Sequence, residues 1–205
     1  ASKNRFGSTS ELGVFEMRND GLREILNPSE ILLNRQSADL SGSSVASIIE
    51  GIRPLMVETQ ALVSYAAYAT PQRTSNGFDT RRLNMLLAVL EKRARFKLSA
   101  KDVFVNVAGG LRVEDPAADL AIVAAILSSA ADIALDKEVC FAGEVGLSGE
   151  IRPASRMDQR LTEAHKLGFR KIYVSEFNEK GVGRGKEIET IRLSRIQELP
   201  KHLFG

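Results

Sequence analysis

The sequence has few of the residues that build disulfides and metal centres: one cysteine, two histidines and no tryptophan among 205 residues. The single cysteine, Cys140, excludes an internal disulfide and a four-cysteine zinc site within this chain, and we interpret it as a core residue. His165 and His202 supply little material for a metal cluster or for a serine–histidine–aspartate triad. We interpret both as surface residues on helices.

Long apolar runs are also missing. No run approaches the roughly 18 residues that a membrane-spanning helix needs, and the N-terminus lacks the basic-then-apolar pattern of a signal peptide. We therefore expect a cytoplasmic protein, and 43% apolar content suits one or two domains with a substantial core. The net charge is only +2, so affinity for nucleic acid has to come from where the basic residues lie.

A nucleotide-hydrolysing P-loop is absent as well, because such a loop requires GxxxxGK followed by serine or threonine. The nearest match starts at Gly181 and runs to Lys186, but Glu187 stands at the hydroxyl position, where it would repel a phosphate. We interpret this stretch as a basic loop, with contact to a nucleic-acid backbone as the alternative.

Among the features that are present, the first is the motif Lys3, Asn4, Arg5, Phe6 and Gly7. In an extended segment residues i and i+2 point to the same side, so Lys3 and Arg5 present their charges together. Two parallel cations suit a phosphate group. The alternative is an ordinary solvated tail.

The rest of residues 1–36 predicts a β-hairpin. Two strand-like stretches, 12–17 and 22–25, are joined by the turn signal Asn19-Asp20-Gly21. A hairpin of this size cannot bury a core of its own and has to lean on another domain. Residues 37–44 are small and polar, as linkers are, so the main domain is predicted to comprise residues 45–205.

The main domain alternates strand and helix patterns, which predicts a mixed α/β fold. Strands are expected within 53–68, as one bent strand or two, and at 103–107, 139–151, 172–174 and 188–193, with a loop at 70–77. Helices are expected to begin at Asp79 and Asp115, which can cap them, and at the capping boxes Ser155-x-x-Asp158 and Ser194-x-x-Gln197. The cations Lys92, Arg93 and Arg95 are explained by the dipole of the helix that they end.

The string GEVGLSGEIRP, Gly143 to Pro153, precedes the helix that ends in EAHKLGFRKIYV. In this order the two strings resemble the proteolytic domain of the Lon family, and the resemblance extends over residues 45–205. It implies the two-layer α/β fold shared with the second domain of the fifth small-subunit ribosomal protein. It also implies a serine nucleophile at the start of a buried helix and a lysine on the helix after Pro153.

Both catalytic residues of that family are replaced in this chain. Pro116 matches the proline before the family's serine, which puts Ala117 at the nucleophile, and the count from Pro153 puts Asp158 at the lysine. Alanine has no oxygen to attack a carbonyl, and aspartate cannot act as the neutral amine that activates one. We therefore expect no peptidase activity and assign no catalytic residue for proteolysis.

A Lon-like domain without its dyad, preceded by KNRFG and STSELGVFEM, resembles the bacterial RadA (Sms) family of DNA-repair and recombination ATPases over essentially the whole chain. The resemblance implies that residues 1–36 are the last piece of a RecA-like ATPase core. Lys3 to Gly7 would then reach the ATP of a neighbouring subunit, with Lys3 and Arg5 as fingers on its γ-phosphate. ATP, magnesium and a zinc finger would belong to the rest of the parent protein, and no cofactor or metal is expected in this chain.

The same resemblance implies a motor that forms a hexameric ring and drives branch migration in recombinational repair. The Lon-like domain would serve as a ring-assembly scaffold and DNA-binding tier, with other copies of itself, single-stranded or branched DNA, and a RecA-type recombinase as partners. Candidate phosphate contacts are Arg81, Arg82, Arg93, Arg156, Arg160, Arg184 and Lys186. The alternatives are an active serine–lysine protease and an RNA-binding module like the ribosomal domain.

Overall fold

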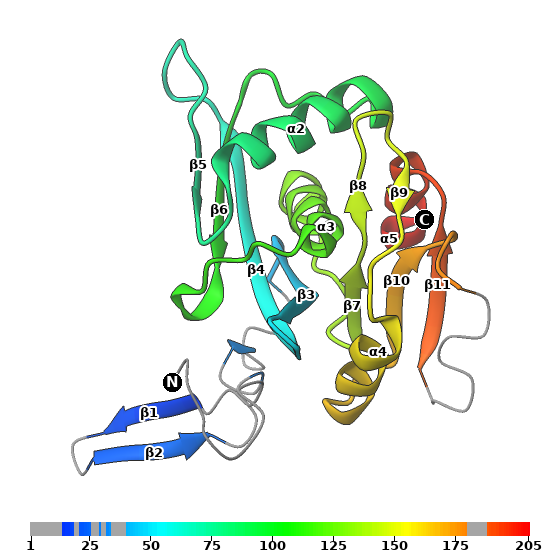
Figure 1. Cartoon of the computed structure of the whole chain (residues 1–205). Helices are drawn as coiled ribbons and strands as arrows, with labels where there is room; N and C mark the ends of the chain where they lie inside the picture. The colour runs from blue at the N-terminus through cyan, green and yellow to red at the C-terminus, as the bar shows by residue number, and fades with distance from the viewer. Residues whose placement is uncertain (1–13, 19–20, 26–28, 30–31, 34–39, 180–187) are drawn as a thin grey trace.

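The computed structural model describes residues 14–18, 21–25, 29, 32–33, 40–179 and 188–205 (Figure 1). The motif Lys3 to Gly7 lies outside the described residues, as do Arg184 and Lys186 of the basic loop. Among the helices of the described ranges, none combines the length and the apolar character needed to cross a bilayer.

The predicted N-terminal hairpin is present. Strand β1 (Val14–Arg18) pairs antiparallel with β2 (Gly21–Ile25), and Arg18 lies opposite Gly21. Gly21 has a φ of +125°, which a residue without a Cβ adopts without strain. Farther along the chain, Met56 N donates to the buried Ser29 Oγ at 3.1 Å, and Leu32 joins the main core. The chain after the hairpin is therefore attached to the main domain.

The main domain is built on a seven-stranded sheet in the order β11-β10-β7-β3-β4-β6-β5. Its strands are β3 (Ser43–Glu50), β4 (Arg53–Tyr65), β5 (Arg73–Asn76), β6 (Lys101–Val107), β7 (Val139–Ala142), β10 (Lys171–Ser175) and β11 (Glu189–Leu193). The β3–β4 and β4–β6 pairs are antiparallel and the other neighbours are parallel. A separate antiparallel pair joins β8 (Glu144–Val145) and β9 (Ile151–Arg152). A mixed α/β fold with a mostly parallel sheet is thus confirmed.

Two details of the sheet differ from the expectation. Strand β3 was not among the predicted strands, and it begins at Ser43, inside the stretch assigned to the linker, because Ser43 pairs with Gln60 of β4. The segment expected to be a loop at 70–77 contains the edge strand β5, which pairs with β6. The four residues of β5 are all polar, so the sequence offered no apolar alternation by which to detect it.

Helices cover both faces of the sheet (Figure 1). They are α2 (Thr80–Ala94), α3 (Asp119–Ala131), α4 (Met157–Lys166) and α5 (Leu199–Phe204), with the 3-10 helices η1 (Ala108–Gly110), η2 (Pro116–Ala118) and η3 (Ile196–Glu198). Val57 and Phe141 pack on the side of α2, α3 and α5, whereas their strand neighbours Met56 and Cys140 pack on the side of α4. The two-layer arrangement implied by the resemblance is therefore wrong here, because α4 adds a third layer.

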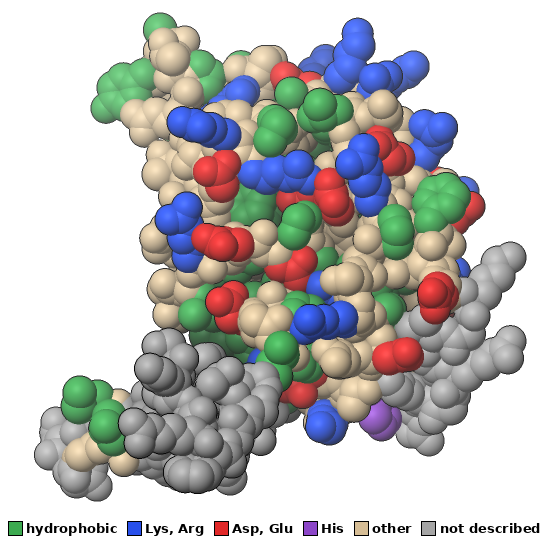
Figure 2. Space-filling model, in the orientation of Figure 1, with side chains coloured by type: hydrophobic (Ala, Val, Ile, Leu, Met, Phe, Trp, Pro, Cys, Tyr) green, Lys and Arg blue, Asp and Glu red, His purple; other side chains and the backbone are tan. Residues whose placement is uncertain are grey.

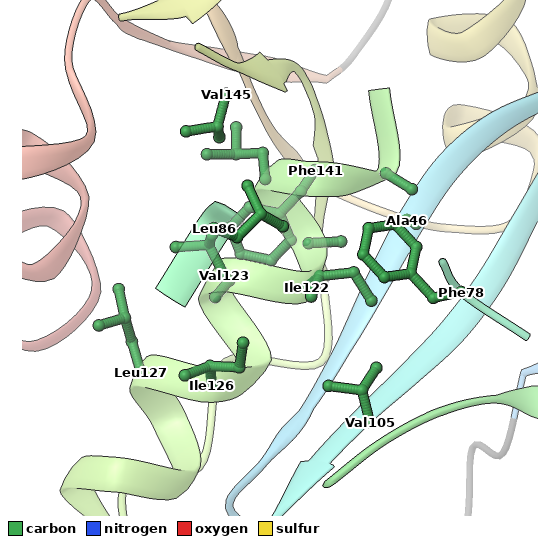
Figure 3. Packing of buried hydrophobic residues seen from close by; sticks show 14 of the residues in the cluster. Ala46, Phe78, Leu86, Val105, Ile122, Val123, Ile126, Leu127, Phe141 and Val145 are labelled. Atoms are coloured by element: carbon green, nitrogen blue, oxygen red, sulfur yellow. The ribbon is translucent and has the colours of Figure 1, made fainter. Parts of the chain in front are cut away.

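Helix α3 forms the centre of the main core (Figure 3). Every residue from Asp119 to Ser128 is buried, which agrees with its apolar character on all sides. Ile122, Val123 and Ile126 lie in one cluster with Phe141 of β7. The packing of α3 fixes the position of its first residue and of η2 just before it.

Several local predictions are confirmed. Asp79 caps α2 by accepting a hydrogen bond from Arg82 N at 2.8 Å, and Asp115 caps η2 by accepting one from Ala117 N at 3.0 Å. Cys140 is fully buried, and both histidines are exposed on α4 and α5. The sequence rules for N-caps were therefore sufficient where a single carboxylate does the capping.

The two predicted capping boxes are wrong. At α4 the cap residue is Arg156, in the left-handed conformation with a φ of +52° and no side-chain capping bond, so Ser155 does not cap the helix. At the C-terminus the partner of Ser194 is Glu198 and not Gln197: Ser194 Oγ donates to Glu198 Oε1 at 2.6 Å. The charged side chain, one residue farther along, is the better acceptor.

Candidate functional site

The two positions matched to a catalytic serine and lysine, Ala117 and Asp158, differ in burial. Ala117 lies in η2 with only 3% of its surface exposed, whereas Asp158 lies exposed in the first turn of α4. Gly143 N donates to Ala117 O at 2.9 Å, and Leu120 N donates to Gly143 O at 3.1 Å, so the backbone of η2 is tied to the end of β7. The side chain at position 117 carries no nucleophile and is closed to solvent.

Asp119, at the start of α3, forms a buried ion pair with Arg82 of α2. Its carboxylate is fully buried and accepts from Arg82 Nε at 3.0 Å, from Arg82 Nη2, and from Val145 N at 3.0 Å. Burial raises the pKa of the Asp119 carboxyl, while the Arg82 guanidinium and the Val145 amide oppose that shift. This first Arg–Asp pair joins α2, α3 and β8.

Arg160 of α4 forms a second buried pair, with Asp115. Its guanidinium is fully buried and donates to Asp115 Oδ2 at 2.6 Å, to Ser155 O at 2.8 Å and to Ser47 O. Asp115 Oδ2 also accepts from Ile49 N at 2.7 Å. Burial lowers the pKa of the Arg160 guanidinium, and Asp115 opposes that shift. This second Arg–Asp pair joins α4, β3 and the start of η2.

The aspartates of the two Arg–Asp pairs, Asp115 and Asp119, lie on either side of Ala117 in the sequence. The two pairs therefore hold η2 between them. A cavity of about 300 Å³ opens beside η2 and is lined by Phe78, Asp79, Arg82, Arg112, Val113, Glu114, Asp115, Pro116, Asp119 and Glu144. These lining residues include no serine, threonine, cysteine, lysine or histidine, and the described residues contain no cluster of His, Cys, Asp and Glu suited to a metal ion. The serine and lysine groups of a serine–lysine hydrolase are therefore not among the residues that line this cavity.

Two of the cations named as DNA contacts are engaged in these pairs. Arg160 is inaccessible to solvent, so it is wrong as a phosphate contact. The Arg82 side chain is 27% exposed, and its guanidinium is committed to Asp119. The sequence held a signal for Arg160, because it lies at i+3 from Met157 and directly before Leu161, on the apolar face of α4.

The remaining described candidates are exposed. Arg81 and Arg93 lie near opposite ends of α2, and Arg156 lies before α4, where it donates to Gly51 O at 3.0 Å. These three side chains come from different parts of the surface. They do not by themselves form one patch.

A continuous basic segment instead runs from the end of α2 to the start of β6, and we call it the basic segment 92–101. It contains Lys92, Arg93, Arg95, Lys97 and Lys101, with no carboxylate between its ends. The first four are exposed, and no ion pair links them to another described residue. Figure 2 shows Lys and Arg side chains gathered at the upper right, over the C-terminal end of α2.

Sequence reasoning explained part of this segment by the helix dipole and missed Lys97 and Lys101. The dipole acts only within the last turn of a helix, and α2 ends at Ala94. The unbroken absence of carboxylates from 92 to 101 was the signal that could have identified the whole segment.

One family model matches part of the main domain. A family model described as subunit ChlI of Mg-chelatase matches residues 78–178. The match runs from just before α2 to just after β10, and it includes both Arg–Asp pairs and the basic segment 92–101. Over this range the chain is similar to a domain found in that class of proteins.

Relatives that match the whole chain share one name. Proteins named DNA repair protein RadA from Bacillus subtilis and Streptococcus pneumoniae are 48% and 46% identical over 205 residues, all of this chain and 45% and 49% of their own lengths. The protein of that name from Synechocystis is 50% identical over 172 residues, 84% of this chain and 34% of its own length. The chain is therefore a homologue of the bacterial RadA proteins over its whole length, and it spans about half the length of the curated relatives that it matches.

Proposed function

We propose that this chain is the non-proteolytic assembly scaffold and DNA-binding tier of an ATP-driven motor for DNA repair, which acts by branch migration of recombination intermediates. The shared name of its relatives supports the repair role. The observation that carries the DNA-binding part is the basic segment 92–101, whose exposed cations are not interrupted by a carboxylate. Other copies of the chain in a hexameric ring, single-stranded or branched DNA, and a RecA-type recombinase are the proposed partners.

The absence of protease groups supports the scaffold role. With Ala117 and Asp158 at the dyad positions, a Lon-like domain would have no catalytic groups for proteolysis. It would still keep the fold, and with it the surfaces through which such domains assemble. The two Arg–Asp pairs make the former nucleophile segment a rigid junction of α2, α3 and α4. Such rigidity suits a tier that transmits force or holds a ring.

The charge of the basic segment supports DNA binding through the phosphate backbone. Log affinity falls linearly with log salt concentration, and each cation that neutralises a duplex phosphate makes this slope steeper by about 0.9. Four exposed cations on one copy give modest affinity, and a ring multiplies it because several copies hold one DNA molecule at once. Binding should therefore be salt-sensitive and largely independent of sequence.

The motif Lys3 to Gly7 gives the proposal its link to ATP. We assign Lys3 and Arg5 as contacts to the γ-phosphate of ATP in the neighbouring subunit, with Asn4, Phe6 and Gly7 shaping the segment that carries them. A finger of this kind contributes about 10³-fold or more to hydrolysis. In a RadA protein of the relatives' full length, Arg5→Ala should abolish ATP hydrolysis and leave ATP binding in place. Unchanged hydrolysis would refute the assignment.

The DNA-binding part is tested by fluorescence anisotropy with a labelled duplex at several salt concentrations. The variant Lys92→Ala/Arg93→Ala/Arg95→Ala/Lys97→Ala should bind at least about tenfold more weakly, and its salt slope should fall by about 3 to 4. The matched control changes four exposed cations elsewhere, Arg112, Lys137, Lys166 and Arg170, to alanine. Equal losses in both variants would mean that only net charge matters and would remove the basic segment as the site.

The same purified chain separates the alternatives. Degradation of casein would establish a protease, and selective, salt-resistant binding of structured RNA would establish a module like the ribosomal domain. A strictly monomeric chain at high concentration, without affinity for DNA at low salt, would contradict both the scaffold and the DNA-binding tier.

A further inference from the structure

The end of β4 and the connection that follows it carry two exposed tyrosines that the proposed function does not use. Tyr65 is 81% exposed and Tyr68 is 71% exposed. Burial of an aromatic side chain is strongly favourable, so two large rings left in solvent within four residues are candidates for a contact surface. Figure 2 shows hydrophobic side chains gathered at the upper left, over the connection between β4 and β5.

The connection that presents Tyr68 is held in place at both ends. The buried carboxylate of Asp102 in β6 accepts from Ala67 N at 3.4 Å and from Gln72 N at 2.7 Å. Ala66 N also donates to Ala100 O at 3.2 Å. Because the backbone on either side of Tyr68 is already fixed, a ligand that binds there does not have to order it.

One face of the Tyr65 ring is covered by a cation. Lys101 lies opposite Tyr65 in the β4–β6 register, and its Nζ lies 3.2 Å from the ring centroid. This cation–π contact orients the ring and leaves its other face available. Lys101 is also the last cation of the basic segment 92–101, so the tyrosines lie where that segment ends.

We propose that Tyr65 and Tyr68 stack on unpaired bases of single-stranded DNA whose phosphates follow the basic segment 92–101. Aromatic faces for the bases and a line of cations for the backbone are the two components of sequence-tolerant single-strand binding. Bases inside a duplex are stacked on each other, which closes their faces to a tyrosine ring. The inference rests on the proposed DNA-binding function and adds to it a base-contacting site and a preference for single strands.

The test compares the 205-residue chain with the variants Tyr65→Ala and Tyr68→Ala, and with Tyr65→Phe and Tyr68→Phe as matched controls that keep the ring. Each alanine variant should bind a single-stranded dT oligonucleotide about fivefold or more weakly. Its affinity for a duplex of the same length and its salt slope should stay unchanged. The phenylalanine variants should bind both DNAs as the parent chain does.

Tyrosine fluorescence supplies a second measurement. The chain contains no tryptophan and three tyrosines, and the third, Tyr173, is buried at 6% exposure. A change in tyrosine fluorescence intensity on addition of DNA is therefore expected to come from Tyr65 and Tyr68. Stacking of bases on their rings should lower that intensity. The double variant Tyr65→Phe/Tyr68→Phe should lose the quenching and keep the affinity.

The outcomes separate this inference from the proposed function. If the alanine variants bind single strands normally while the variant of the basic segment loses affinity, the tyrosine site is refuted and the DNA-binding tier stands. If the alanine variants change the oligomeric mass and not the affinity for DNA, the tyrosines are contacts between copies and the inference fails. If neither set of variants alters DNA binding, both proposals fail.

Discussion

Replacement of Arg160 by methionine is the most direct test of the site around η2. Methionine is unbranched and fills part of the same space, but it donates no hydrogen bond. The change removes a bond to the Asp115 carboxylate and bonds to the carbonyl oxygens of Ser155 and Ser47. Asp115 would keep its bond from Ile49 N and lose its counter-charge.

The expected magnitude follows from these contacts. All three bonds are donated by a charged guanidinium. A hydrogen bond with a charged group contributes about 1.5–3 kcal/mol, so the three together contribute about 4.5–9 kcal/mol. Loss of one partner from a buried pair independently costs about 3–5 kcal/mol. Since a domain of this kind is stable by only about 5–15 kcal/mol, Arg160→Met should remove a large fraction of its stability.

Urea denaturation followed by far-UV circular dichroism measures this change. Arg170→Met is the matched control, because Arg170 is 75% exposed and pairs with Glu138 at 3.1 Å on the surface. The control should lose no more than about 1 kcal/mol. Arg160→Met/Asp115→Asn should be destabilised by less than the sum of its single changes. A loss from Arg160→Met as small as that of the control would refute the structural role of the pair.

Three further predictions concern other parts of the domain. Gly77 has a φ of +76°, and a Cβ there would collide with Leu111 O, so Gly77→Ala should lower the free energy of unfolding by about 2 kcal/mol or more; an unchanged urea midpoint would contradict this. Hydrogen bonds from its own backbone N–H and from Arg152 lower the pKa of Glu150 below the ordinary 4.5, so its stabilisation is present above that value and is lost as the pH falls through the folded pKa. The stability difference between the parent chain and Glu150→Gln should therefore shrink between pH 7 and about pH 3, and a constant difference would argue against it. Ala117→Ser/Asp158→Lys should leave the chain unable to digest fluorescent casein, because position 117 is buried between the Arg–Asp pairs; measurable digestion would show that the site is more open than the structure indicates.

Local rules predicted much of the fold. The hairpin of β1 and β2, the caps at Asp79 and Asp115, and the largely apolar helix α3 depend on neighbouring residues or on the spacing of apolar side chains. The same rules failed where a distant residue decided the outcome. Strand β5 is a strand because β6, which begins about 25 residues after it, lies beside it.

For the candidate site too, some features could be predicted from the sequence and others required the structure. The prediction that Ala117 and Asp158 stand at the positions of a catalytic serine and lysine rests on the order of motifs alone. The roles of the arginines could not be read in this way, because a guanidinium looks the same in sequence whether it faces solvent or a buried carboxylate. Arg160 and Arg93 were therefore grouped together, although one is inaccessible and the other is exposed.

By itself the sequence determined the similarity of this chain to the bacterial RadA proteins and its mixed α/β character, because these depend on residue identity and on short-range spacing. Only the tertiary structure decided which charges are available. It buried Arg160 against Asp115, engaged Arg82 with Asp119, and brought Lys101 onto the ring of Tyr65. The physical reason is that desolvation and pairing depend on three-dimensional neighbours, which for these residues lie 36 or more positions away in the chain.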